Sequence, residues 1–536
     1  MRLRRRLVLT MSLALVAASA VAIGAPPASG GGSGDNILRY GVEAEADGLN
    51  PTANRFAAAG YMMANAVYDP LFRLGKDREF HPWLAESATP NEDFTTWDIK
   101  LRSDVTFHDG TPLTSEALVV NLQEQLADPL ISLAINDFFD PDNPIEVVDE
   151  LTARYNMAGP NAHIEQYFVS QIGYIASPTY IEAAKANPDL NQEPVGTGPF
   201  VFESRTQDSS TTFVRNDDYW AGDVKLDGIE FVIQTDPARR ADQLLADELD
   251  MMHTSDFGTI DLLRGEDVQT IEQGTAEEGF ALINTQAPPF DDVRARKALA
   301  LATPRKNYLQ IIGKGVAEPA DSMFHPSSPF SNPDVKQEAD KPAAAKKLAA
   351  EYCADVPENC EGDKIKFTFK YTGPSEILEL TADVLIDGWD AAFVVERAQE
   401  LQDDYVLHVA TGDYQVVAWR QFGADDPDGD FTWIDCRNAG EPGSLSITWS
   451  RFCNEEIQAL GQEQRASAEQ SVQVENWQTI SEILNEEYVY IFLSHTIWQI
   501  AASNDVKNPV FTKLADGGRS VLGNGVHSVW QISLKG

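Results

Sequence analysis

Basic residues are scarce in this chain of 536 residues, where 41 Lys and Arg stand against 83 Asp and Glu and give a formal net charge of -42. A surface this negative repels the phosphate backbone of nucleic acids and anionic lipid headgroups. The composition therefore argues against nucleic acid as a partner. Hydrophobic residues make up 43% of the chain, which is enough for a large core, and the length favours more than one lobe.

Short catalytic motifs are also missing. The eight histidines are scattered singly, with no His-Glu-x-x-His pair for zinc, and there is no Gly-x-Ser-x-Gly elbow for a serine nucleophile. Gly196 and Gly198 lack the Lys-Ser/Thr ending of a phosphate-binding loop. We therefore expect a protein that is not an enzyme and carries no cofactor, with a secreted hydrolase as the less favoured alternative.

An aspartate-rich stretch, WRQFGADDPDGDF, begins at Trp419. Three alternating aspartates match the first three ligands of an EF-hand calcium loop: Asp426, Asp428 and Asp430. The sixth position, a glycine in that loop, is Phe431, and the twelfth, a bidentate glutamate, is Arg437. The pattern favours a hydrogen-bonded polar loop over a calcium site, and we predict no metal.

Cysteine is rare as well, and all four residues lie in the second half of the chain: Cys353, Cys360, Cys436 and Cys453. An even number in two local pairs favours two disulfides in an oxidising compartment, although four cysteines allow three connectivities. Neither pair has the Cys-x-x-Cys spacing of a zinc site.

The N-terminus is typical of an export signal. MRLRRR is followed by the apolar run LVLTMSLALVAASAVAIGA and the flexible PPASGGGSGD, so that residues 1–34 are predicted to be a cleaved signal peptide and linker. An uncleaved membrane anchor is the alternative, because an apolar run of this length is just able to span a bilayer. No cysteine lies near this segment to accept a lipid anchor. We expect an exported protein, periplasmic or at the cell envelope or extracellular, that is not embedded in the membrane.

Strand and helix patterns alternate along the rest of the chain. Trp97, Ile99 and Leu101 alternate with polar residues as in a half-buried strand, and Thr114 is a good N-cap for a following helix. Asp291 or Asp292 is placed to cap a second helix. FALINTQ and YVYIFL are predicted to be strands.

Several of these segments occur together in one order: VYDPLF, PWLAES, WDIKLRSDVTFHDGTPLTSEALVVNL, PVGTGPF, VRNDDYW and PFDDVRARKAL. From about residue 37 to 530 the chain resembles the family 5 solute-binding proteins of ABC importers, the dipeptide and oligopeptide type. The resemblance implies an α/β fold, the two-lobed periplasmic-binding-protein clamshell of type II, with an extra subdomain in the first lobe. It places the first lobe at 35–284 plus 497–536, its inserted subdomain at about 76–196, and the second lobe at 285–496.

This resemblance implies a receptor that captures an oligopeptide or similar small solute between its lobes. Hinge closure then buries the solute, and the permease subunits of an ABC transporter take it up. The implied partners are the solute and the permease, and we expect a monomer.

In this family the stretch GDYQVVAWRQFGADDP aligns with a second-lobe strand and loop that face the ligand. The candidate contacts that the comparison gives are Trp419, Arg420, Phe422, Gly423, Asp425 and Asp426, with Phe56 from the first lobe. A tryptophan face stacks on a side chain or sugar ring, and an arginine donates to carboxylates or hydroxyls. The alternative role for the aromatic residues is packing within the strand layer. The alternative role for Arg420 is a surface salt bridge.

The sequence departs from the family at the two charge anchors for dipeptides. Peptide-binding members carry an aspartate four residues before the proline of this loop, where Gly423 stands here. Asp425 or Asp426 is a possible substitute. The stretch FKYTGPSEILEL lacks the arginine that holds a dipeptide carboxylate. We therefore favour longer peptides or neutral, sugar-like solutes, with an oligosaccharide receptor of the same fold as the alternative function.

Dipeptide-type members also carry two cysteines around the loop after this strand. The resemblance therefore pairs Cys436 with Cys453 and leaves Cys353 with Cys360 as a second, peripheral bridge. Closing a loop of this size contributes on the order of 3 kcal/mol in the chain-entropy model.

Overall fold

The computed structural model describes residues 36–441, 443–514 and 517–535, except the side chains at 275, 276 and 403. By its contacts the chain divides into residues 1–36 and residues 37–536, and all elements named below belong to the second part. The signal peptide and linker expected over residues 1–34 lie outside the described residues.

A mixed sheet of 12 strands organises this part of the chain. Its strands lie in the order β14 (Cys360–Glu361), β15 (Lys364–Thr372), β17 (Val416–Gln421), β12 (Gln269–Ile283), β18 (Tyr490–Ala502), β11 (Met251–Thr254), β1 (Ile37–Val42), β10 (Gly228–Ile233), β9 (Ser210–Arg215) and β8 (Phe200–Thr206). Off this path, β13 (Glu318–Pro319) pairs with β18, and β16 (Phe393–Glu400) pairs with β15.

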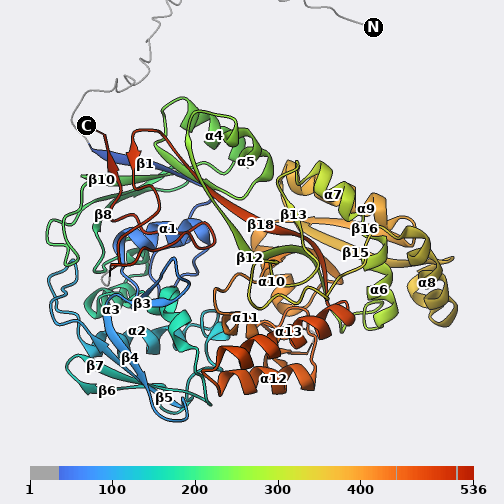
Figure 1. Cartoon of the computed structure of the whole chain (residues 1–536), viewed down its shortest axis with the longest axis horizontal. Coiled ribbons are helices and arrows are strands. Elements are labelled where there is room, and N and C mark those ends of the chain that lie inside the picture. The colour runs from blue at the N-terminus through green and yellow to red at the C-terminus, as the bar shows by residue number, and fades with distance from the viewer. Residues whose placement is uncertain (1–35, 442, 515–516, 536) are drawn as a thin grey trace, which may run out of the picture. The chain divides into compact units, whose positions relative to one another are not determined.

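The long strands β12 and β18 run antiparallel through the middle of the sheet, in green and red in Figure 1. Every residue of β18 is buried, which fits its nearly continuous apolar sequence YIFLSHTIWQIAA. The strand predicted at YVYIFL therefore exists but continues as far as Ala502. FALINTQ lies at the end of β12, as predicted for a strand, up to Ile283.

Helices accompany each half of this sheet (Figure 1). The half that contains β1 carries α1 (Ala58–Val67), α3 (Pro178–Ala186), α4 (Pro237–Leu245) and α5 (Phe257–Arg264). The half that contains β15 carries α6 (Val293–Ala302), α7 (Arg305–Ile311), α8 (Pro342–Asp355), α9 (Glu376–Trp389) and α10 (Gln402–Thr411). Asp292 caps α6, since its side chain accepts a hydrogen bond from the backbone of Arg294.

A separate four-stranded sheet is built from β4 (Ala85–Pro90), β5 (Thr96–Leu101), β7 (Thr152–Asn156) and β6 (Ile145–Asp149), in that order. The predicted strand at Trp97 to Leu101 is part of β5, with these two side chains and Ile99 buried. Helix α2 (Ser115–Ala127) packs on this sheet and begins directly after Thr114, as expected, but the Thr114 side chain makes no capping hydrogen bond. The segment after this sheet, which carries His163 and Tyr167, reaches the candidate site.

Three further helices, α11 (Asp428–Phe431), α12 (Glu455–Arg465) and α13 (Gln470–Glu486), follow β17 in sequence and lie together in the lower part of Figure 1. The remaining elements are β2 (Phe72–Leu74), β3 (Phe80–Pro82), β19 (Val506–Lys507), β20 (Ser533–Leu534) and the 3₁₀ turns η1 (Ser132–Ala134), η2 (Ile164–Val169), η3 (Gln171–Gly173), η4 (Pro188–Gln192), η5 (Pro357–Asn359) and η6 (Cys436–Asn438).

The buried apolar residues form several separate cores rather than one. One core packs α1 against β1 and β10, and another lies under the four-stranded sheet. Two more lie in the half that contains β15, and one of these surrounds the fully buried Trp477 of α13. The loop after β17 is anchored in that last core through Phe422 and Phe431.

Both disulfides form in the structure. Cys436 pairs with Cys453 and Cys353 pairs with Cys360, as the resemblance indicated. The Cys436–Cys453 bridge spans a sequence separation of 17 residues between α11 and α12 and so constrains the chain directly after the aspartate-rich loop.

Candidate functional site

Strand β17 carries the first two candidate contacts on opposite faces. In its antiparallel pairing with β12, Trp419 lies opposite Phe280 and Arg420 lies opposite Gly279, and neighbouring side chains of a strand point to opposite sides. The Trp419 ring stacks on Tyr405 with centroids 5.7 Å apart and meets Trp449 edge-to-face at 4.5 Å. Trp419 therefore packs against aromatic side chains of the core beside it.

Arg420 points to the other face and joins a polar group that we name the strand-crossing cluster: Ser255, Glu277, Arg420 and Trp498. The Arg420 Nε lies 3.0 Å from Glu277 Oε1 in a salt bridge, and a terminal guanidinium nitrogen donates to Ser255 Oγ over 2.9 Å. Its guanidinium carbon lies 5.3 Å from the centroid of the Trp498 ring. The Arg420 side chain nevertheless remains 41% exposed, so that a charged donor faces solvent where β12, β17 and β18 meet.

Acidic groups surround this arginine. Trp498 Nε1 donates to Glu277 Oε2 over 3.1 Å, which fixes that carboxylate beside the guanidinium. Burial alone lowers the pKa of Arg420, but the charges of Glu277 and Glu43 outweigh it and raise the pKa. The cluster thus presents an arginine and a carboxylate side by side, the pair of groups that recognises polar solutes.

Phe422 begins the loop after β17 with an unusual backbone. Its φ of 62° lies in the left-handed region, which is costly for a bulky residue. The ring is only 2% exposed and packs on Phe280 and Tyr490, with centroids 5.7 and 5.0 Å away. The buried Phe422 ring therefore stabilises the turn at which the loop leaves β17.

Gly423 has a carboxylate next to its backbone although it lacks one of its own. Its backbone nitrogen donates to Asp430 over 3.3 Å, as does that of Ala424, and its carbonyl accepts from Asn524 over 2.8 Å. Burial raises the pKa of Asp430 to about 7, although these backbone hydrogen bonds act against the rise. A side chain at 423 would meet the amide of Asn524, since a Cβ there comes within 2.8 Å of its nitrogen.

Asp425 and Asp426 are both engaged by distant parts of the chain. Asp425 pairs with Arg78, and Asp426 accepts from His163 Nδ1 over 3.0 Å and from Gln473 over 2.6 Å. The imidazole also contacts the Gln464 carbonyl through Nε2 at 3.1 Å. Burial lowers the pKa of His163, but the hydrogen bond to Asp426 and the charges of Asp426 and Asp428 raise it to about 9.

Asp428, which the sequence suggested only as a failed calcium ligand, is fully buried at the start of α11. One carboxylate oxygen accepts from the Tyr167 hydroxyl over 2.8 Å, and the other accepts from Gln464 and from Arg465 Nε over 2.5 Å each. Burial acts to raise the pKa of Asp428, but the charge and hydrogen bond of Arg465, together with the charge of His163 and the hydrogen bond of Tyr167, lower it. Asp426 and Asp428 thus connect this loop to residues that lie both earlier and later in the chain.

Phe56, the candidate contact from the first lobe, lies just before α1. Its ring is half-buried, with the Tyr61 ring edge-to-face at 5.6 Å and the Tyr174 ring at 6.4 Å. Its backbone nitrogen donates to Gln171 over 3.3 Å. Phe56 thus belongs to an aromatic group at the edge of the first core.

One buried pair near the loop escaped the sequence-based reasoning. Glu278 in β12 and His495 in β18 face each other, with 2.8 Å between Glu278 Oε1 and His495 Nδ1. Burial raises the pKa of Glu278 well above its usual range and lowers that of His495 to about 3. Burial thus disfavours the charged form of both groups, and no local sequence motif distinguishes them.

No metal centre is formed by the part of the chain that the structure describes: three or more His, Cys, Asp or Glu side chains nowhere gather in a metal-binding arrangement. Among the described helices, none combines the length and apolar character needed to cross a membrane.

Comparison with known proteins identifies the family. Residues 79–441 match the model of the bacterial extracellular solute-binding proteins, family 5 middle region. The chain belongs to this family. Di/tripeptide-binding protein 2 of Pseudomonas aeruginosa is 25% identical to this family 5 protein over 92% of this chain and 95% of the relative. The nickel-binding periplasmic protein of Escherichia coli is 24% identical over 65% and 70%, respectively.

Solved structures agree on the fold of this family 5 protein. A dipeptide-binding protein from Pseudoalteromonas sp. SM9913 in complex with Met-Leu superposes with a TM-score of 0.79 at 20% identity, covering 93% of this chain and all of the other. The fold is therefore the α/β, two-lobed periplasmic-binding-protein clamshell that the sequence resemblance implied. As a family 5 member, the protein is an extracytoplasmic solute-binding protein of an ABC importer, in a family of transport receptors and not of enzymes.

Proposed function

We propose that this protein captures an oligopeptide or similar small polar solute at the strand-crossing cluster and delivers it to an ABC permease. The proposed lobes are residues 35–284 with 497–536, including a subdomain at about 76–196, and residues 285–496. On this division β12 and β18 contain the hinge, and a solute bound beside them favours the closed arrangement that the permease engages.

The observation that carries the proposal is the exposed Arg420 next to Glu277. On the proposed division Arg420 belongs to the second lobe and donates to Ser255 of the first, so that both lobes contribute to the same polar surface. A peptide backbone offers acceptors for the guanidinium and donors for the carboxylate. Gly423, whose backbone nitrogen is bound by Asp430, remains a candidate contact at the start of the loop after β17.

Native mass spectrometry of the purified protein, followed by thermal-shift screening with peptides, oligosaccharides and nickel complexes, tests the solute class. A solute at a hundred times its Kd stabilises the folded state by about 2.7 kcal/mol. Stabilisation by peptides of three or more residues supports the proposal. Stabilisation by oligosaccharides alone would instead identify a sugar receptor of the same fold.

Arg420→Gln tests the site itself. Removing a charged donor from a solute carboxylate or carbonyl weakens binding by about 10- to 150-fold. Arg397→Gln is the matched control, because Arg397 is 37% exposed, pairs with Asp383 and lies over the ring of Tyr371. Calorimetric titration with the peptide found in the screen measures both variants. Equal affinities for wild type and Arg420→Gln would remove Arg420 from the binding site.

A further inference from the structure

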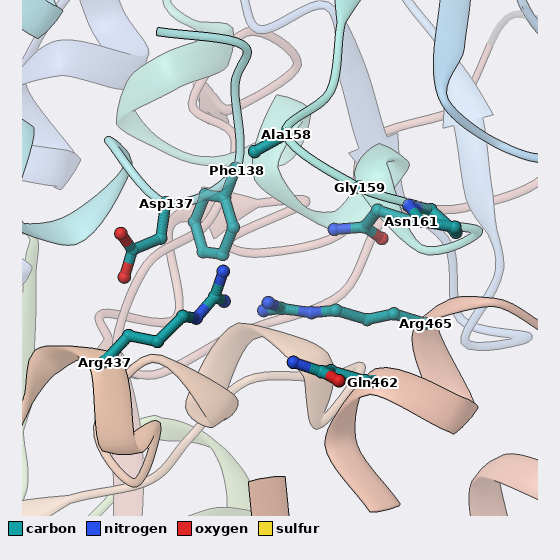
Figure 2. A pocket seen from close by; sticks show the side chains of 9 residues that line it. Asp137, Phe138, Ala158, Gly159, Asn161, Arg437, Gln462 and Arg465 are labelled. Atoms are coloured by element: carbon teal, nitrogen blue, oxygen red, sulfur yellow. The ribbon is translucent and has the colours of Figure 1, made fainter. Parts of the chain in front are cut away.

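A pocket separate from the strand-crossing cluster lies between two distant segments of the chain. It has a volume of about 330 Å³, within the range of small-ligand sites. Its lining residues are Asp137, Phe138, Ala158, Gly159, Pro160 and Asn161 from one segment and Arg437, Gln462 and Arg465 from the other (Figure 2). It shares no lining residue with the cluster around Arg420.

Two guanidinium groups face each other across this pocket (Figure 2). Arg437 is bound to Asp435 through Nε and Nη2, at 3.0 and 2.6 Å, and its end points toward the ring of Phe138. Arg465 comes from the end of α12, in the same segment as Arg437, and its guanidinium points toward that of Arg437. Both side chains stay charged at any physiological pH, so that they repel each other when nothing lies between them.

Arg465 also has a donor without a hydrogen-bond partner. Its Nε is used by Asp428, and its guanidinium carbon lies 5.0 Å from the Phe138 ring centroid and 4.7 Å from that of Phe431. The residue is only 6% exposed, and its Nη2 is buried without a hydrogen-bond partner within the described part of the chain. An unpaired buried donor is costly, and a ligand that supplies an acceptor removes that cost.

The other polar lining residues fit the same kind of ligand. The side-chain amides of Asn161 and Gln462 lie on the side of Arg465 in Figure 2, and the amide nitrogen of Asn161 also donates to Asp428 over 3.4 Å. Asp137, the acidic member of the lining, lies across Phe138 from Asn161 and Arg465 and next to Arg437. Donors therefore converge on the side of Arg465, where an acceptor-rich group is best stabilised.

We propose that this pocket binds an oxyanion group, a carboxylate or a phosphate, between Arg437 and Arg465. The oxygens of the anion accept from both guanidinium groups and relieve their mutual repulsion. Because residues 137–161 and 437–465 both line the pocket, the bound anion stabilises the contact between these segments. The anion is either a free ion or the acidic end of the transported solute, and the chemistry of the pocket is the same in both cases.

Calorimetric titration of the full-length protein with inorganic phosphate and with acetate, at constant ionic strength, tests the pocket. We expect saturable binding of at least one anion, and Arg437→Gln weakens it by about tenfold or more, as the loss of a charged hydrogen bond predicts. Gln462→Glu, which adds a negative charge to the lining, weakens it further. Arg465 is left intact, since its removal would leave the buried Asp428 without its charge partner.

Arg294→Gln is the matched control. Arg294 is 36% exposed and binds Asp292, two residues before it, through Nε and Nη2 at 3.1 and 2.7 Å, as Arg437 binds Asp435. The anion affinity of the Arg294→Gln variant should equal that of the wild type. Absence of saturable binding by both anions in the wild type, or equal affinity in Arg437→Gln, overturns the proposal.

Competition distinguishes the two sources of the anion. Tetra-alanine with a free carboxyl terminus and its C-terminal amide serve as probes, each titrated with and without saturating phosphate. If phosphate weakens binding of the free acid but not of the amide, the pocket takes the end of the solute. If phosphate and both peptides bind independently while Arg437→Gln still weakens phosphate binding, the pocket takes a free ion.

Discussion

His163 is predicted to remain protonated well above neutral pH because Asp426 lies against it. Its pKa rises from 6.5 to about 9 even though burial acts in the opposite direction. The folded state therefore holds one more proton than the unfolded state between pH 6.5 and about 9. Stability from this group is fully present below pH 6.5 and is lost as the pH rises through about 9, and the shift corresponds to on the order of 3 kcal/mol.

Two substitutions separate the charge from the packing. Asp426→Asn keeps a side chain of the same size but removes the negative charge, so that burial is opposed only by the charge of Asp428 and the Gln464 carbonyl, and the pKa of His163 should fall. His163→Gln removes the titrating group, and the unfolding free energy of this variant should change less than that of the wild type between pH 6.5 and about 9.

Titration of the imidazole carbon-bound protons by NMR measures this pKa directly, and the missing signal of His163→Gln assigns the resonance. Urea unfolding at several pH values measures the accompanying change in stability. A wild-type His163 that titrates near 6.5, or a pKa that stays the same in Asp426→Asn, would refute the reasoning.

Two further substitutions test the loop and its anchor. Asp428→Asn leaves the buried Arg465 without its charge partner and should destabilise the protein by about 3 to 5 kcal/mol. Thermal unfolding measures this change, and a cost near zero would show that the Asp428–Arg465 pair does not stabilise the fold. Replacing Cys436 and Cys453 together by serine opens the bridge and should cost on the order of 3 kcal/mol. An unchanged unfolding temperature in this double variant would show that the bridge does not constrain the chain.

Local rules explain which elements the sequence predicted. The helix after Thr114 and the cap at Asp292 depend on residues within a turn of each other, and the strand around Ile99 depends on alternation over a few positions. The fold class followed from ordered motifs along the whole chain. The boundaries of the two lobes remain a prediction, because they depend on how the halves move and not on local pattern.

The candidate site was harder to predict because facing and pairing are decided by distant residues. Trp419 and Arg420 are neighbours, and alternation alone says that one points inward but not which one. The pairing with β12 decides it and directs Arg420 to Glu277. Asp428 finds Tyr167 at a separation of 261 residues, which no spacing rule in the loop could indicate.

The loop after β17 connects the two proposed sites physically. It follows directly from the strand that carries Arg420, and Asp428 within it binds Arg465, which lines the oxyanion pocket. On its other side Asp428 is held by Tyr167. If solute binding shifts the equilibrium of this loop, it changes the anion affinity of the pocket, and by linkage the anion changes solute affinity by the same factor. A solute affinity that phosphate leaves unchanged would mean that the loop keeps one position in both states, and its aspartates would then serve stability alone.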